Sequence, residues 1–347
     1  MGCDSVDRMG EAGFQRGPGG RPDFNPARYR DDLVAIIREI ESLPEVDGPG
    51  LAGILRRHPR DGRGFFSRAQ LIAGFRHFAT REDFESREED FVRRIAMRPV
   101  RSQSGVTPVT VLTKPFPCPG RCIFCPNDVR MPKSYLSDEP GAQRAANNRF
   151  DPYLQTWNRL AAFRDIGHPT EKIELIVLGG TWSFYPEPYQ VGFIARCFEA
   201  MNDFGEGADR RAEARPDARD FSSLPGSVDV RQGSPGIYNR TLTHFLGTQP
   251  VAEFECADWS HLEDAQRKNE AAGSRCVGLS VETRPDHVTR EEVLRLRRLG
   301  CTKIQIGIQS LSDSVLEANQ RGHDVATTRD ALAWLRGAGF KLHAHWM

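Results

Sequence analysis

Five short apolar runs, spaced along most of a 347-residue chain, constrain its fold more than any other feature. The runs are rich in Ile, Val and Leu, as is typical of parallel strands that are buried on both faces. Helices are expected between the later runs, one at 290–299 with Thr289 as its N-cap and one near 326–337. This alternation predicts an α/β fold, either a parallel (β/α) barrel or an open sheet. The expected strands are 109–113, 173–178, 276–281, 303–308 and 340–346.

A small helical domain is expected before the first strand. Apolar residues recur at helical spacing over 31–43, and Pro44 marks the end of that helix. Ser67-Arg-Ala-Gln70 matches a capping box that begins a second helix, and a third is expected at 83–95. The residues before this domain are rich in Gly, Arg and Pro and are expected to be disordered. The predicted division is a disordered tail at 1–26, a helical domain at 27–98 and a barrel at 99–347.

Two irregularities interrupt the barrel pattern. Residues 203–235 are dense in Gly, Asp, Arg, Ala and Pro, a composition that cannot form a core. They predict a flexible surface insertion that reaches to about 203–250. The chain also stops at Met347, directly on an apolar strand, so the barrel is expected to be truncated at its C-terminus.

Glycine and polar motifs follow the predicted strands. Gly179-Gly180-Thr181, Glu282-Thr283-Arg284 and Gln309-Ser310 each stand where a strand should end. Because the carboxyl ends of parallel strands meet at one edge, these motifs are expected to share a functional rim.

The same rim should hold a loop with three cysteines, Cys118, Cys122 and Cys125, in the spacing C-x3-C-x2-C. Prolines and a glycine interleave with them, which forbids regular structure and favours a loop that wraps around a cofactor. Three thiolates suit a four-iron cluster with one iron left free of protein ligands, which can chelate S-adenosylmethionine. One electron from such a cluster then generates a 5′-deoxyadenosyl radical.

Two other interpretations of these cysteines stay open. Free cysteines are often buried as small apolar residues. A zinc site would need one more ligand than the loop supplies. That fourth ligand could be a histidine or one of the other thiols, Cys197, Cys256, Cys276 and Cys301.

Composition narrows the function classes. The 47 basic and 47 acidic residues balance, so no global field indicates a nucleic-acid or membrane partner. Eight cysteines in a chain of this length form no disulfide framework and fit a reducing compartment. No apolar run approaches ~20 residues and no signal peptide is visible, so a cytoplasmic protein without membrane contact is expected.

The helical domain nevertheless concentrates positive charge. Between residues 51 and 81 there are seven arginines and a single acid, Asp61. Such an excess suits phosphate contacts, although a solvated helix face would have the same composition. The arginines proposed to contact nucleic acid are Arg56, Arg57, Arg60, Arg63, Arg68 and Arg76.

Several motifs occur in an order that resembles one family. From about residue 98 to Met347 the chain is similar to the radical half of the catalytic subunit of Elongator and its single-chain prokaryotic counterparts. The tight spacing of the first two cysteines matches the bacterial forms. The motifs are Pro117 to Pro126, Asp151 to Thr156, Gly179 to Thr181, Cys276 to Leu279 with Glu282 to Asp286, Ile306 to Ser310, and Arg321-Gly-His323.

The resemblance implies a partial radical S-adenosylmethionine barrel with a [4Fe-4S] cluster. It also implies modification of C5 of the wobble uridine in tRNA, with acetyl-CoA as co-substrate. In the family an acetyltransferase-like domain after the barrel supplies the acetyl-CoA, and this sequence does not contain it. An electron donor is required, and Elongator-type partner subunits are not identified by the sequence.

The resemblance further implies roles for individual residues. Cys118, Cys122 and Cys125 would ligate the cluster, and the arginine-rich stretch would contact tRNA. The remaining site residues would surround S-adenosylmethionine or the target nucleoside: Gly179, Gly180, Thr181, Glu282, Arg284 and Gln309.

Two alternatives remain at this point. One is a radical S-adenosylmethionine enzyme that acts on a small molecule, as an oxygen-independent porphyrinogen oxidase does. The other is a non-catalytic tRNA-binding protein with a zinc-stabilised loop.

Overall fold

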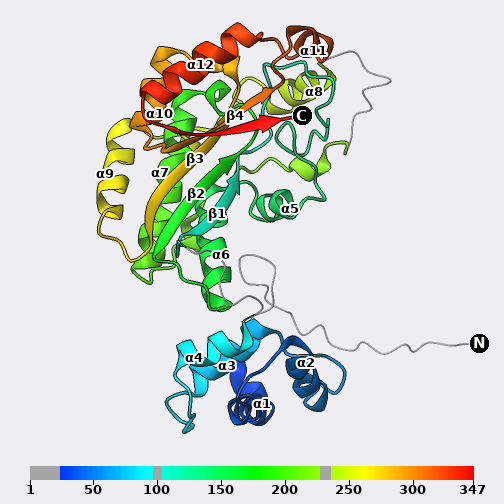
Figure 1. Cartoon of the computed structure of the whole chain (residues 1–347), viewed down its shortest axis with the longest axis vertical. Coiled ribbons are helices and arrows are strands. Elements are labelled where there is room, and N and C mark those ends of the chain that lie inside the picture. The colour runs from blue at the N-terminus through cyan, green and yellow to red at the C-terminus, as the bar shows by residue number, and fades with distance from the viewer. Residues whose placement is uncertain (1–23, 97–103, 227–235) are drawn as a thin grey trace, which may run out of the picture.

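The computed structural model describes residues 24–96, 104–226 and 236–347. Most of the expected tail (1–23), the expected boundary between the helical domain and the barrel (98/99), and residues 227–235 of the expected insertion lie outside these residues. The described chain forms a small helical part and a larger α/β part (Figure 1).

The helical part begins earlier than predicted. Phe24 stacks on Tyr29 at 5.6 Å between ring centroids and packs edge-on against Phe66, so the predicted tail is wrong at its last residues. The predicted capping box is present, because Ser67 and Gln70 each accept a backbone N–H from the other. The helices are α1 (Arg30–Ser42), α2 (Gly48–Arg57), α3 (Arg68–Phe78) and α4 (Glu88–Ile95), preceded by a 3-10 turn at Pro26–Tyr29.

Two helix predictions in this part need correction. Helix α2 was not expected, since Gly48, Pro49 and Gly50 stand in its first turn; the side chain of Asp47 caps it by accepting the Gly50 N–H. Helix α4 is shorter than the expected 83–95 and begins only at Glu88. Leu33, Ile37 and Phe75 lie in a closed apolar core that these helices share.

The α/β part contains one sheet of five parallel strands in the order β1-β2-β3-β4-β5. Each neighbour in space is the neighbour in sequence, which is the arrangement of a (β/α) barrel rather than of a doubly wound sheet. The fold class predicted from the five apolar runs is therefore confirmed. The strands are β1 (Thr107–Leu112), β2 (Lys172–Leu178), β3 (Arg275–Thr283), β4 (Lys303–Gln309) and β5 (Lys341–Trp346).

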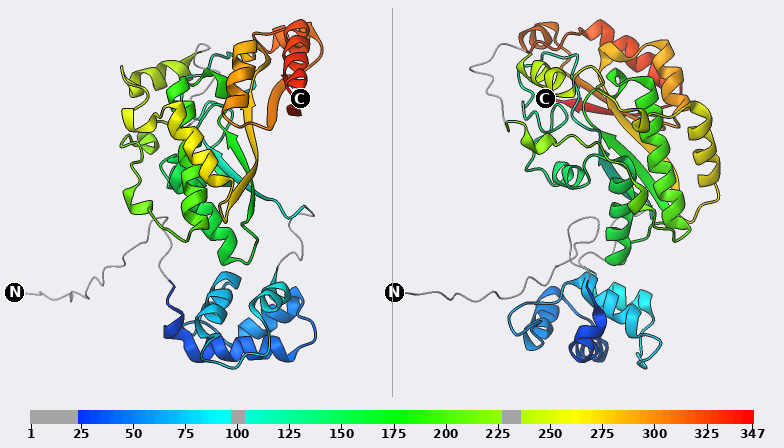
Figure 2. Two further views of the ribbon diagram at one scale, coloured as in Figure 1. Left: turned by 90° about the vertical axis from the view of Figure 1, so that its left-hand side faces the viewer. Right: turned by 180° about the vertical axis from the view of Figure 1, so that it is seen from behind.

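Helices cover the outer face of this curved sheet (Figures 1 and 2). Ile173, Leu175 and Val177 of β2 point into the core beneath them, as alternate residues of a strand must. The covering helices are α6 (Pro152–Asp165), α7 (Glu187–Gly205), α9 (Trp259–Asn269), α10 (Arg290–Arg298) and α12 (Val325–Gly337). Three others, α5 (Pro140–Asn147), α8 (Ile237–Leu246) and α11 (Asp313–Ala318), lie nearer the carboxyl ends of the strands.

Polar side chains form a connected row on the other face of the sheet. Gln305 donates from Nε2 to the hydroxyl of Ser280 at 3.2 Å, and its Oε1 lies 3.2 Å from Nε2 of His345. Nδ1 of His345 is 3.7 Å from Glu282 at the end of β3. This row leads across three strands to the predicted rim.

The expectation of a flexible insertion at 203–250 is wrong for the described residues. Residues 203–205 complete α7, while Phe221 and Leu242 are buried in the main core. The polar composition forms local turns instead: in both Asp209-Arg-Arg211 and Asp217-Ala-Arg219, the aspartate accepts the backbone N–H and the guanidinium of the arginine two residues on. Composition alone misses such turns, because each Asp-x-Arg unit satisfies its own charges.

Candidate functional site

The three cysteines lie on an irregular loop that follows β1, at the carboxyl end of the sheet. Two uncharged side chains, Asn239 and Tyr238, hold the backbone of this loop by hydrogen bonds. Asn239 of α8 accepts the Cys118 N–H through Oδ1 at 2.9 Å and donates from Nδ2 to the Cys118 carbonyl at 2.7 Å. Tyr238 donates its hydroxyl to the Met131 carbonyl at 2.8 Å. A helix inside the supposed insertion therefore positions the cysteine loop.

Cys122 is the most enclosed of the three thiols, with 8% of its surface exposed. Two buried guanidinium groups face its sulfur: Nη1 of Arg321 at 3.2 Å and Nη1 of Arg284 at 3.4 Å. Cys125 hydrogen-bonds Cys122 and also lies 3.4 Å from the hydroxyl of Ser134.

These contacts give the three thiols different pKa values. The hydrogen bond from Cys125, with the charges of Arg321 and Arg284, lowers the pKa of Cys122 against the opposing effect of burial. Donation to Cys122 and burial raise the pKa of Cys125, and burial raises that of Cys118. The loop is thus poised to present at least one thiolate, the form in which cysteine binds metal.

The Gly179-Gly180-Thr181 turn closes against the same loop. Gly179 has φ +149°, and a Cβ there would lie 1.8 Å from Oγ1 of Thr113, while Gly180 has φ +86°. Side chains are therefore excluded from this turn, and the backbone approaches the site closely. Thr181 is buried and its hydroxyl reaches the thiol of Cys118.

Glu282 ties this turn to β3. Its Oε2 accepts the hydroxyl of Tyr135 at 2.7 Å and the Gly180 N–H at 3.3 Å. Burial, together with the charge of Glu282, raises the pKa of Tyr135 well above its usual range, so Tyr135 stays a donor. Glu282 therefore lies at the rim, with Oε2 bonded by the protein and Oε1 3.7 Å from Nδ1 of His345.

The guanidinium of Arg284 is bound by protein groups, and Gln309 ends β4 at the rim. The guanidinium of Arg284 forks onto Asp286 at 2.9 and 2.8 Å and also donates to the carbonyl of Arg321, which leaves only the Nη1 edge, facing Cys122. It is engaged by the protein rather than directed at a nucleoside. Gln309 ends β4 at φ +69°, where the pairing with β5 shifts register, and its carbonyl accepts the Met347 N–H.

The donor set of the loop fits an iron–sulfur cluster. Within residues 24–96, 104–226 and 236–347, no three His, Cys, Asp or Glu side chains converge closely enough to hold one metal ion. A four-iron cluster makes no such demand, because each of its thiolates binds a different iron. Cys197 and Cys301, candidates for a fourth zinc ligand, are instead buried in the apolar core. Nε of the neighbouring Arg321 is buried without a hydrogen-bond partner among the described residues, so the site contains an unsatisfied donor.

The six candidate arginines of the helical part fall into two groups. Four of them contact protein groups. Arg57 pairs with Glu39, and Arg60 lies 3.9 Å from Asp61. Arg68 donates to the Ile95 carbonyl, while Arg76 pairs with Glu88 at 2.7 Å and donates to the Arg164 carbonyl at 3.1 Å. In contrast, Arg56 and Arg63 are exposed and make no side-chain hydrogen bond or ion pair with the described residues. Phe65, beside Arg63, is 57% exposed.

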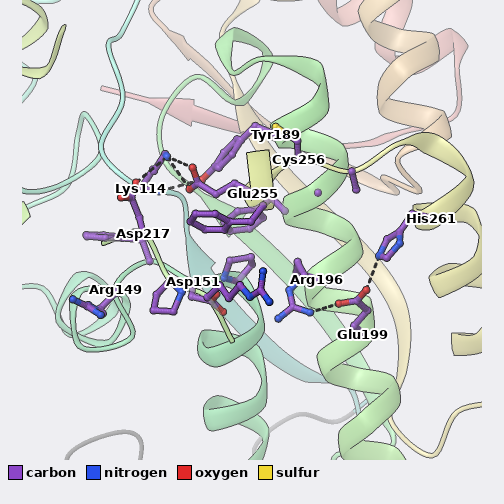
Figure 3. Close-up of a pocket in the computed structure, with 18 of the residues that line it drawn as sticks. Lys114, Arg149, Asp151, Tyr189, Arg196, Glu199, Asp217, Glu255, Cys256 and His261 are labelled. Atoms are coloured by element: carbon purple, nitrogen blue, oxygen red, sulfur yellow. Dashed lines mark hydrogen bonds and ion pairs between the residues drawn. The ribbon is translucent and has the colours of Figure 1, made fainter. Parts of the chain in front are cut away.

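A separate cavity of about 510 Å³ lies beneath the start of the cysteine loop (Figure 3). Lys114, with 1% of its side chain exposed, meets Glu255 at 2.5 and 2.7 Å and Asp217 at 3.1 Å. Arg219 in turn pairs with Asp217, so two cations face two carboxylates. The cavity therefore contains a closed charge network that joins β1 to the segments around residues 217 and 255.

Sequence reasoning missed four residues that shape the site: Asn239, Tyr135, Lys114 and Arg321. Asn239 and Lys114 act across more than a hundred residues of sequence, and no local pattern identifies such pairs. Arg321 carried a usable signal, because Arg321-Gly-His323 was already among the motifs of the resemblance. Among the described residues, no helix is long and apolar enough to cross a bilayer.

Comparisons with known proteins found several similar proteins. The Radical SAM superfamily model matches residues 257–347. A tRNA uridine(34) acetyltransferase of Dehalococcoides mccartyi is 35% identical over 247 residues, which cover 71% of this chain and 42% of that protein. One of Methanocaldococcus jannaschii is 34% identical over 302 residues, 85% of this chain and 44% of that protein.

More distant relatives extend the set. Elongator complex protein 3 of Danio rerio is 28% identical over 74% of this chain and 39% of its own length. The solved structure of archaeal Methanocaldococcus infernus Elp3 with an N-terminal deletion aligns with 70% of this chain at 29% identity and a TM-score of 0.45. The chain spans less than half the length of these curated relatives. Over 71–85% of its length the chain is therefore similar to proteins named tRNA uridine(34) acetyltransferase, and its residues 257–347 match the Radical SAM superfamily.

Proposed function

We propose that this chain carries the cluster of a radical S-adenosylmethionine enzyme that modifies C5 of the wobble uridine in tRNA. The observation that carries the proposal is the convergence of Cys118, Cys122 and Cys125 with Thr181 and Glu282 at one rim of a parallel barrel-type sheet. The similarity to proteins named tRNA uridine(34) acetyltransferase supports the substrate. When bound to the three thiolates, the cluster would supply the electron that cleaves S-adenosylmethionine.

The residues of the rim would divide the remaining tasks. Gly179 and Gly180 let the turn pack closely against Thr113 and the Lys133 carbonyl, which would fix the position of Thr181 beside the loop. The second oxygen of Glu282 and the hydroxyl of Thr181 would orient S-adenosylmethionine or the nucleoside. Gln309 would face the mouth of the barrel. Arg284 would hold Cys122 instead of contacting the substrate.

The helical part would contact tRNA through Arg56 and Arg63. Both are exposed, and neither has a counter-ion among the described residues, so each can reach a phosphate. The exposed ring of Phe65 offers a surface on which an unpaired base can stack. Arg57, Arg68 and Arg76 are engaged within the protein and would contribute less.

Other partners follow from the same proposal. Acetyl-CoA would be the co-substrate of a longer protein, and an unidentified donor would reduce the cluster. The balanced charge and the free state of the seven described cysteines support a reducing, cytoplasmic setting.

Electron paramagnetic resonance of the full chain tests the cluster. After anaerobic reconstitution with iron and sulfide, we expect roughly four irons per chain and a reduced-state signal that changes on adding S-adenosylmethionine. Cys122→Ala should lose the signal and S-adenosylmethionine cleavage while retaining tRNA affinity. Cys256→Ala, which removes a thiol outside the three-cysteine loop, is the matched control. It should keep the signal, S-adenosylmethionine cleavage and tRNA affinity. Zinc in place of iron, or full cleavage by Cys122→Ala, would refute the proposal.

A salt titration of tRNA binding tests the substrate. Replacing Arg56 and Arg63 together by glutamine should reduce the slope of log K against log salt by about 2, one for each phosphate contact. Arg336→Gln, which removes an exposed arginine from α12, should leave the slope unchanged. Binding of the unaltered chain with no salt dependence would favour a small-molecule substrate instead.

A further inference from the structure

Arg321 is a buried cation in an unusual setting. It follows α11, and 4% of its surface is exposed. Its Nη2 donates to the Gly307 carbonyl at 2.6 Å, its Nη1 faces Cys122 at 3.2 Å, and its Nε has no partner among the described residues. The guanidinium carbon lies 5.6 Å from the centre of the Phe124 ring.

Among the described residues, no carboxylate lies within ion-pair distance of Arg321. Arg284 also faces Cys122, but its charge is balanced by Asp286 at 2.8 Å. Neither ring nitrogen of His323 has a hydrogen-bond partner among the described residues, although Nδ1 lies 3.9 Å from Asp286. Burial lowers the pKa of this imidazole, which favours its neutral form. A buried cation without an anion costs several kcal/mol, so a negative charge is needed where Cys122 lies.

We propose that Arg321 is the counter-charge of the iron–sulfur cluster and sets its reduction potential. This inference rests on the proposed function, which places the cluster on Cys118, Cys122 and Cys125. Reduction adds one electron to the cluster and forms or breaks no bond, so the cluster gains one unit of negative charge. A fixed buried cation stabilises that reduced state more than the oxidised state, and hydrogen bonding to a ligating sulfur acts in the same direction. Arg321 is therefore a positioning residue with an electrostatic effect on the cluster.

The experiment is a redox titration of the reconstituted full chain, with dithionite as the electron source and the reduced-cluster signal as the readout. Arg321→Met removes the charge and keeps a chain of similar length, while Arg321→Gln removes the charge but keeps a donor for the Gly307 carbonyl. Arg321→Lys keeps the charge. Arg336→Met removes an exposed charge from α12 and is the matched control.

We expect Arg321→Met and Arg321→Gln to lower the reduced fraction, relative to the oxidised fraction, at least tenfold at a fixed potential. For a one-electron couple this is a downward shift of about 59 mV. Arg321→Lys should recover most of the shift, and Arg336→Met should match the unaltered chain. Equal potentials for the unaltered chain and Arg321→Gln would overturn the inference while leaving the cluster assignment intact.

Failure to assemble a cluster is also informative. If the uncharged variants lose the cluster and Arg321→Lys keeps it, the positive charge is required to hold it, as proposed. If Arg321→Lys loses it as well, the shape of the guanidinium matters rather than its charge, and the inference is wrong. Absence of a cluster from the unaltered chain would instead refute the proposed function.

Discussion

Lys114, at the start of the cysteine-bearing segment, and Arg321, beside Cys122, are two buried cations whose surroundings differ in kind. The ammonium of Lys114 is enclosed by Glu255 and Asp217 (Figure 3). The guanidinium of Arg321 meets a carbonyl and a sulfur but no carboxylate among the described residues. The first site is electrically complete without a ligand, and the second is complete only when an anion joins it.

This difference separates a structural charge from a functional one. Breaking a closed ion pair leaves a buried charge unpaired, which destabilises the fold. Removing a buried cation that has no carboxylate partner instead weakens the binding of the anion that it faces. Burial alone does not distinguish the two cases, since both side chains are almost fully enclosed.

The largest expected effect is on the closed site. Lys114→Met leaves Glu255 without its main partner and should lower the free energy of unfolding by about 3 kcal/mol. Urea titration of the full chain measures it. Lys303→Met, which breaks a half-exposed pair with Glu174, is the control and should cost less than about 1 kcal/mol. Similar losses in the two variants would remove the contrast between the sites.

Low pH should weaken the ion pairs around Lys114. Although burial favours its neutral form, hydrogen bonds from Arg219 and the charge of Lys114 lower the pKa of Asp217 to about 2. A carboxyl with a depressed folded-state pKa stabilises above its unfolded pKa, and this stabilisation is lost as the pH falls toward the folded value. From the ordinary value of 3.8 to about 2, the contribution is roughly 2 kcal/mol.

Urea titrations of Asp217→Asn at several pH values test that contribution. The variant should be less stable than the unaltered chain at pH 7, and the difference should shrink between about pH 4 and pH 2. Asp264→Asn, at an exposed position, should show no such difference. A stability gap that stays constant with pH would show that Asp217 does not act through its charge.

A third change tests the position of the cysteine loop separately from the charge of Arg321. Asn239→Ala removes both bonds to the Cys118 backbone and should destabilise the loop by about 1–2 kcal/mol. Fewer chains should then retain iron, but the clusters that form should keep the potential of the unaltered chain. Iron content and redox titration measure the two quantities, and Thr243→Ala on the exposed face of α8 is the control. A shifted potential in Asn239→Ala would mean that loop position also sets the potential.

The smallest expected effect has the opposite sign to that of Arg321→Met. Asp286→Asn frees the charge of Arg284, which faces Cys122, so a second uncompensated cation then lies at the site. The reduced fraction of the cluster at fixed potential should rise by less than tenfold, because Asp286 lies beyond Arg284. The redox titration described for Arg321 measures it. A fall would contradict the electrostatic account of this site.

Local patterns predicted much of the architecture. The five apolar runs predicted all five strands to within a few residues, because each strand that packs against the helices needs apolar side chains on that face. The capping box at Ser67 was equally local, and it is present. The segment after residue 203 was predicted wrongly, since its polar residues satisfy one another in Asp-x-Arg turns and α8 buries Leu242.

The sequence by itself determined the positions of the strands, the motifs at their carboxyl ends and the spacing of the three thiols, because these depend on neighbours along the chain. The order of the strands in the sheet came from the structure. Only the tertiary structure decided which buried charges have an oppositely charged partner. The partners of Lys114 are 103 and 141 residues away, and the contact between Arg321 and Cys122 spans 199 residues. Electrostatic energy depends on distance through space and on burial, and neither can be obtained from local sequence patterns.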